Sequence, residues 1–106
     1  MAGGWLVVRA VVADSGDRAA FDEWYRREHF PDAVKAFSAQ AAWRGWSKAE
    51  PSVHCAHYRF GSLDRLDAVM AGAEIAALVA EFDRCWNGRV TRTREVMAVA
   101  DETGEQ

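Results

Sequence analysis

Apolar residues recur along the chain in patterns that predict four strands. Residues 5–13 form a nearly continuous apolar run, which is typical of a strand covered on both faces. Residues 41–48 and 53–60 predict two further strands that a short turn joins as a hairpin. Residues 89–100 predict the last strand, and the ends beyond the outer strands are expected to be flexible over residues 1–4 and 101–106.

The first segment with a helical period lies between the first two strands, at residues 17–29. Pro31 is expected to end this helix, because the residue before a proline is pushed out of the helical conformation. A short helical turn is expected to follow at residues 32–38. The residues that this period places on one face are Phe21, Trp24, Tyr25 and Glu28.

A second helical region begins at Ser62 and contains Gly72, where we expect a break or a kink. Asn87 and Gly88 predict its end, because glycine adopts the left-handed conformation at low cost. The apolar face of its second half consists of Ile75, Leu78, Val79, Phe82 and Trp86.

The resulting order is β-α-β-β-α-β, the split βαβ pattern of the ferredoxin-like α+β fold. Residues 1–106 are expected to form a single domain of this kind, with a four-stranded antiparallel sheet and both helices on one sheet face. The other face then needs a cover, because the strands carry apolar or aromatic groups on both sides. A second copy of the chain is the simplest cover, and a monomer with an unusually apolar sheet face remains the alternative. The residues concerned are Trp43, Trp46, His54, Cys55, Tyr58, Met97 and Val99.

Composition excludes several classes of function. The net charge of −3 and the absence of a basic run or stripe argue against nucleic-acid binding. Cys55 and Cys85 lack metal-ligand spacing, so no metal site is expected. No nucleotide-binding motif is present, and no cofactor is expected. The absence of a long apolar run or a secretory segment predicts a cytoplasmic protein without a membrane partner.

The densest basic stretch contains Arg89, Arg92 and Arg94. A solvated strand edge with salt-bridge partners explains such a stretch in the simplest way. The alternative is a pocket that binds an anionic group of a substrate.

Residues 21–32, FDEWYRREHFPD, resemble the F-x-x-W-Y-x-x-E-H-x-P signature of EthD-like and related dimeric α/β-barrel proteins. The resemblance implies a homodimer whose sheets pack face to face, with a cleft between sheet and helices in each subunit. Such families include cofactor-independent monooxygenases, isomerases, cyclases, haem-handling enzymes and proteins without known activity, so the fold alone is a poor guide to chemistry. The Pro-Gly-Phe turn often found after the first helix is replaced by residues 37–40, FSAQ.

His29 is the leading candidate for chemistry. Its expected place at a helix C-terminus favours a protonated imidazole, which can act as an acid or a base near neutral pH. A capping or packing histidine is the competing interpretation. Glu28 is the second catalytic candidate, although adjacent helical residues do not face each other and a direct pair with His29 is not expected.

The aromatic residues near this segment are candidates for binding a small hydrophobic or aromatic molecule. Core packing and the dimer interface are the alternatives for the same side chains. His54 and His57 point to opposite faces of their strand, and we expect His57 on a buried face. The candidate substrate-binding residues are Trp24, Tyr25, Trp43, His57 and Tyr58.

Three functional hypotheses follow. The first is a cofactor-independent oxygenase, isomerase, cyclase or decarboxylase that acts on a small hydrophobic or aromatic compound, with His29 as acid or base. The second is a non-catalytic dimer that binds a small molecule or has a stress-related role. The third is haem binding through His29 or His57, for which the sequence shows no specific spacing.

Overall fold

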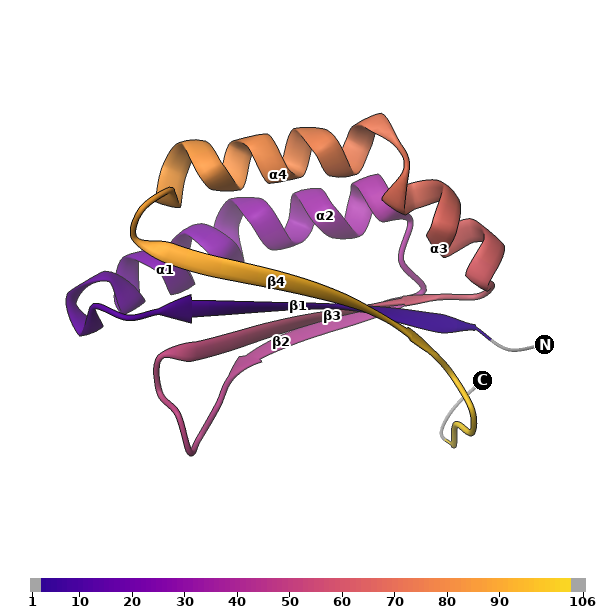
Figure 1. Cartoon of the computed structure of the whole chain (residues 1–106), viewed down its shortest axis with the longest axis horizontal. Helices are drawn as coiled ribbons and strands as arrows, with labels where there is room; N and C mark the ends of the chain where they lie inside the picture. The colour runs from indigo at the N-terminus through magenta and orange to yellow at the C-terminus, as the bar shows by residue number, and fades with distance from the viewer. Residues whose placement is uncertain (1–2, 104–106) are drawn as a thin grey trace.

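Four strands form one antiparallel sheet in the order β2-β3-β1-β4 (Figure 1). The strands are β1 (Gly4–Val12), β2 (Ala41–Trp46), β3 (Val53–Phe60) and β4 (Val90–Ala98). This computed structural model describes residues 3–103, and of the ends expected to be flexible, residues 1–2 and 104–106 lie outside this range. The strand order confirms the predicted ferredoxin-like α+β fold, and the strand bounds differ from the prediction only at their ends.

All helices lie on one side of the sheet, and α2 and α4 run side by side across it (Figure 1). The helical elements are η1 (Ser15–Asp17), α1 (Arg18–Trp24), η2 (Tyr25–His29), α2 (Phe30–Phe37), α3 (Leu63–Met70) and α4 (Ala73–Trp86). Ser62 caps α3, since its hydroxyl accepts a hydrogen bond from the Arg65 amide at 3.1 Å. The predicted break at Gly72 is confirmed, because α3 ends and α4 begins beside it.

The prediction that Pro31 ends the first helix is wrong. The chain forms a π-helical turn over η2, in which the Phe30 amide donates to the carbonyl five residues earlier, on Tyr25. Pro31 therefore lies in the first turn of α2, a position for which the fixed φ angle of proline is suited. The wider turn also directs His29 toward the sheet and leaves Glu28 exposed, so the expected buried position of Glu28 is wrong as well.

The core lies between the helices and the covered face of the sheet. Phe21 is fully buried at the centre of an aromatic cluster. Its ring centroid lies 5.2 Å from that of Trp86, 5.4 Å from that of His54 and 5.9 Å from that of Phe82. Such tilted and edge-to-face contacts stabilise beyond the area that they bury.

The other face of the sheet has no cover within the chain. Trp43 is 55% exposed on it and Met97 is 45% exposed. His57 stacks on Trp43 with ring centroids 3.8 Å apart and an interplanar angle of 8°. The expectation that His57 lies on a buried face is therefore wrong for the single chain, because odd positions of β3 point away from the helices.

Within residues 3–103, no group of three or more His, Cys, Asp or Glu side chains is arranged to bind a metal ion. Both cysteines, Cys55 and Cys85, are free thiols. None of the helices in this range combines the length and the hydropathy needed to cross a membrane.

Replacing Phe21 with alanine should lower the free energy of unfolding by roughly 3–5 kcal/mol, because a cavity would open at the centre of the aromatic cluster. Val96→Ala is the matched control, since this residue is 41% exposed, and should change stability by less than about 0.5 kcal/mol. Urea denaturation at one fixed protein concentration measures both. A loss below about 1 kcal/mol for Phe21→Ala would contradict the described core.

Candidate functional site

A small cavity lies between the sheet and the helices α2 and α4. Its volume is about 30 Å³, enough for roughly one water molecule. Apolar side chains from β1, α2 and α4 form most of its wall. The polar residues that line it are Tyr25, His29, Tyr58, Arg92 and Arg94.

His29 is buried beside this cavity with 9% of its surface exposed. Its ring stacks on Trp24 at 4.8 Å and contacts Tyr25 edge-on at 4.9 Å. Burial, reinforced by the positive charge of Arg92, lowers the pKa of His29 to about 4. The expected protonated imidazole at a helix C-terminus is therefore wrong, because the helix continues past His29 and its surroundings exclude water. A neutral imidazole can accept a proton but cannot donate one as an acid at neutral pH.

The two tyrosines contribute phenol groups that stay protonated. Burial raises the pKa of Tyr25 to about 12 and also raises the pKa of Tyr58. The hydroxyl of Tyr58 is buried near that of Tyr25 and makes no hydrogen bond of normal geometry with any described residue. Such an unsatisfied donor is uncommon in a native protein and is available to a ligand or a water molecule in the cavity.

Two arginines contribute positive charge at the β4 side of the cavity. Arg92 and Arg94 pair with Ala10 and Val8 of β1, so both arginines point toward the helix-covered face. The Arg92 guanidinium lies over the Phe82 ring, with its carbon 4.5 Å from the ring centroid.

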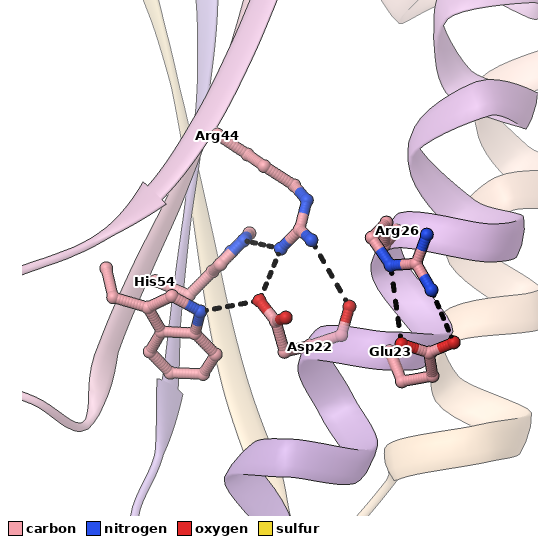
Figure 2. A network of polar contacts seen from close by, with 6 residues as sticks. Asp22, Glu23, Arg26, Arg44 and His54 are labelled. Carbon is pink, nitrogen blue, oxygen red and sulfur yellow. Dashed lines mark hydrogen bonds and ion pairs between the residues drawn. The ribbon is translucent and has the colours of Figure 1, made fainter.

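A second polar cluster joins α1 to the strands β2 and β3 (Figure 2). Asp22 Oδ1 accepts two hydrogen bonds of 2.8 Å, one from Trp46 Nε1 and one from Arg44 Nη1. The hydrogen bond from Trp46 is the main cause that lowers the pKa of Asp22, and Arg44 adds to it. Glu23 and Arg26 form a separate ion pair on the outer side of the same helix (Figure 2).

His54 connects this second cluster to the cavity. Its Nε2 atom lies 3.2 Å from Arg44 Nη1, and because a guanidinium only donates, Nε2 accepts and Nδ1 carries the proton. Burial and the Arg44 charge lower the pKa of His54 to about 4. The Tyr25 ring lies 4.5 Å from the His54 ring and 4.9 Å from the His29 ring, so Tyr25 packs between the two histidines.

The structure separates the predicted site residues into two groups. Tyr25, His29 and Tyr58 line the cavity, and Trp24 packs against His29. Trp43 and His57 lie together on the opposite face of the sheet, where burial lowers the pKa of His57. Glu28 projects to solvent.

Sequence reasoning missed Asp22 and Arg44 altogether. Asp22 looks like a residue of the solvent face of a helix, and Arg44 like the polar position of a strand. Their contact joins residues far apart in the chain and depends on how α1 packs on β2. In the sequence, only the basic stretch that contains Arg92 and Arg94 indicated a charged cavity.

Comparison with known proteins shows similarity in structure and not in sequence. No family model matches the chain, and no curated protein matches it. A point mutant of SnoaB, a cofactor-independent oxygenase from Streptomyces nogalater, is 11% identical with a TM-score of 0.68, over 97% of this chain and 98% of that one. An EthD family protein from Bacillus halodurans C-125 is 18% identical with a TM-score of 0.61, over 86% and 96% of the two chains. A dimeric ferredoxin-like protein from an uncultured marine organism is 14% identical with a TM-score of 0.60, over 97% and 100%.

The chain thus has the ferredoxin-like fold of the dimeric α/β-barrel proteins. Within that class its structural neighbours include the EthD family protein and the oxygenase SnoaB, so the resemblance found at residues 21–32 is confirmed at the level of the fold. At such low identity the likeness establishes the fold and no activity.

The two buried histidines should make the protein less stable as the pH falls from about 6.5 toward 4. Their pKa values of about 4 in the folded chain lie below the ordinary value of 6.5, so the unfolded chain binds more protons in this range. Each histidine should contribute up to about 3 kcal/mol of stability at neutral pH that is lost on acidification. Urea denaturation between about pH 4 and pH 7.5 measures this loss.

His29→Gln and His54→Gln should each flatten that pH dependence, whereas His57→Gln should change it less. An NMR titration of the three rings checks the assignment directly. A midpoint near the ordinary value of about 6.5 for both His29 and His54 would show that neither imidazole is buried as described.

Proposed function

We propose that this chain is a small homodimeric enzyme that needs no cofactor and uses His29 as a general base on a small hydrophobic or aromatic compound. The observation that carries the proposal is a neutral, buried imidazole beside a mainly apolar cavity that tyrosine and arginine side chains also line. The name of one structural neighbour, a cofactor-independent oxygenase, supports the same direction.

The proposed step is the removal of a proton from the carbon next to a carbonyl group or from the hydroxyl of a phenol. The C–H or O–H bond of the substrate breaks, an N–H bond forms on His29, and the electron pair moves to the substrate oxygen. A base whose conjugate acid has a pKa of about 4 removes only acidic protons, so the resulting oxyanion needs stabilisation. The Tyr58 hydroxyl and the Arg92 guanidinium line the same cavity and can provide it.

Several reactions share this step. Isomerisation, cyclisation and decarboxylation need only acid–base help and positioning, whereas oxygenation without a cofactor needs a substrate that ionises easily. Haem does not suit the cavity, since about 30 Å³ beside His29 leaves no room for a macrocycle. Glu28 has no part in the proposed step.

The homodimer is proposed from the uncovered face of the sheet. Trp43 and Met97 are largely exposed there, and Trp5, Val7 and Val11 on β1 are only half-buried. Large apolar patches on a sheet face are typical of interfaces. One structural neighbour is a dimeric ferredoxin-like protein, and a second copy packed in the same way would cover these side chains.

The size of the cavity favours a second candidate, a non-catalytic dimer that binds a small molecule. A cavity of about 150 Å³ accommodates benzene, and the cavity beside His29 is only about 30 Å³. A substrate with an aromatic ring must therefore insert only its reacting edge or displace side chains of α4. A protein whose cavity is filled by its own side chains would show binding without turnover.

Deuterium exchange distinguishes the two candidates. In D₂O near neutral pH, the protein should speed exchange of the acidic C–H protons of 2-tetralone or phenylpyruvate above the buffer rate, as followed by NMR. His29→Gln should reduce this acceleration by about 10²-fold or more, because the base is lost. Glu28→Gln, its exposed neighbour, should leave it unchanged.

Full exchange activity in His29→Gln would refute the catalytic role of His29. Absence of any acceleration by the unaltered protein, together with measurable binding of either compound, would favour the non-catalytic candidate.

The proposed dimer should have twice the 11.8 kDa mass of one chain at micromolar concentration, as measured by light scattering after size exclusion. Trp43→Glu should shift the mass toward one chain, because a buried unpaired charge is costly at an interface. Ala68→Glu adds the same charge on the exposed side of α3 and should leave the dimer intact. A single-chain mass for the unaltered protein would exclude the dimer.

A further inference from the structure

We infer that the β4 side of the cavity is a carboxylate-binding subsite, in which Arg92 binds the carboxylate of an otherwise apolar substrate. This inference deepens the proposed function and rests on it for the place where the substrate binds. It adds a chemical class to the ligand, an aryl or alkyl monocarboxylate, which the deprotonation step alone does not require.

The charges around the cavity are unbalanced. Among the described residues that line it, Arg92 and Arg94 carry the charge, and none is an aspartate or a glutamate. The carboxylate nearest to Arg92 is that of Asp83, at 3.5 Å, and this side chain is 54% exposed to water. Water screens such a pair, so it neutralises Arg92 only weakly.

Arg92 also has a buried donor that is only weakly satisfied. Its buried Nη1 atom lies 3.5 Å from Asp83 Oδ1, too far for a hydrogen bond of normal geometry. A buried guanidinium N–H without an acceptor costs free energy, and an anionic oxygen in the cavity would remove that cost. This weak contact is the one with Asp83 that leaves the charge of Arg92 poorly neutralised, and it favours a ligand oxygen over a purely apolar ligand.

Tyr58 supplies a second buried donor to the same cavity. It is 1% exposed and comes from a different strand than Arg92, and its hydroxyl lies near that of Tyr25 without a hydrogen bond of normal geometry among the described residues. Both residues line the cavity, so each is a candidate donor to a carboxylate oxygen placed there. Because His29 is neutral, it does not attract the anion away from Arg92.

The cavity itself favours a carboxylate over a phosphate or a sulfate. It is small and its wall is mainly aliphatic, with Leu6, Val8, Ile75 and Leu78 among its residues. A planar monoanion costs less to transfer into such a place than a tetrahedral anion that needs more donors. The net charge of −3 disfavours unspecific uptake of anions by the whole chain, so any selective binding depends on this local arrangement.

Benzoate and its neutral analogue benzamide test the inference by direct binding. In NMR titrations of the full chain at millimolar ligand, benzoate should bind at least about 10-fold more tightly than benzamide. Arg92→Gln should weaken benzoate binding at least about 10-fold, and Tyr58→Phe should weaken it several-fold. Arg26→Gln removes the same charge from the outer surface of the helix and should have no effect.

Arg92→Lys is a second variant that keeps the inference testable if Arg92→Gln does not fold. It retains the positive charge but lacks the planar guanidinium, so it should bind benzoate with intermediate affinity. The subsite would be overturned if benzamide bound as tightly as benzoate, or if benzoate did not bind at all. It would also be overturned if folded Arg92→Gln bound benzoate with unchanged affinity, or if inorganic phosphate competed more strongly than acetate. Because binding needs no turnover, His29→Gln can abolish deuterium exchange and still bind benzoate, so a failure of the subsite and a failure of the proposed catalysis are distinguishable.

Discussion

The widened turn at Tyr25–His29 determines where the chemistry of this chain lies. A regular helix would have ended before Pro31 and left His29 at an exposed, negatively polarised terminus. The π-helical turn instead accommodates the proline at the start of α2 and directs His29 inward, where burial keeps the imidazole neutral. Insertions of this kind are frequent at functional sites, because they redirect one side chain without interrupting the helix around it.

The sequence was sufficient to predict the sheet and the second helical region. Long apolar strands, the Ser62 cap and the break at Gly72 are local patterns whose meaning does not depend on the rest of the fold. The continuation past Pro31 could not be predicted, because a π turn leaves no periodic signal of its own in so short a segment. The same shift of register explains why Glu28 was assigned to the inner face in place of His29.

The site was predicted only in part, for a different reason. Of the candidate residues, Tyr25, His29 and Tyr58 line the cavity, whereas Trp43 and His57 lie on the other side of the sheet. Alternation along β3 places successive side chains on opposite faces, but it does not say which face the helices cover when both are apolar. The cluster of Asp22, Arg44 and His54 depends on helix–sheet packing, which sequence spacing does not encode.

Burial affects the charges of the two basic side chains in the cavity, His29 and Arg92, differently. It removes the charge of His29, whereas Arg92 keeps its charge because no accessible pH deprotonates a guanidinium. The positive charge of Arg92 further lowers the pKa of His29 and makes this imidazole a weaker base in the empty protein. An anionic ligand on Arg92 would cancel that effect and raise the pKa of His29 toward its ordinary value. Binding of the substrate would thereby strengthen the base that acts on it, and a carboxylate would do so where a neutral compound would not.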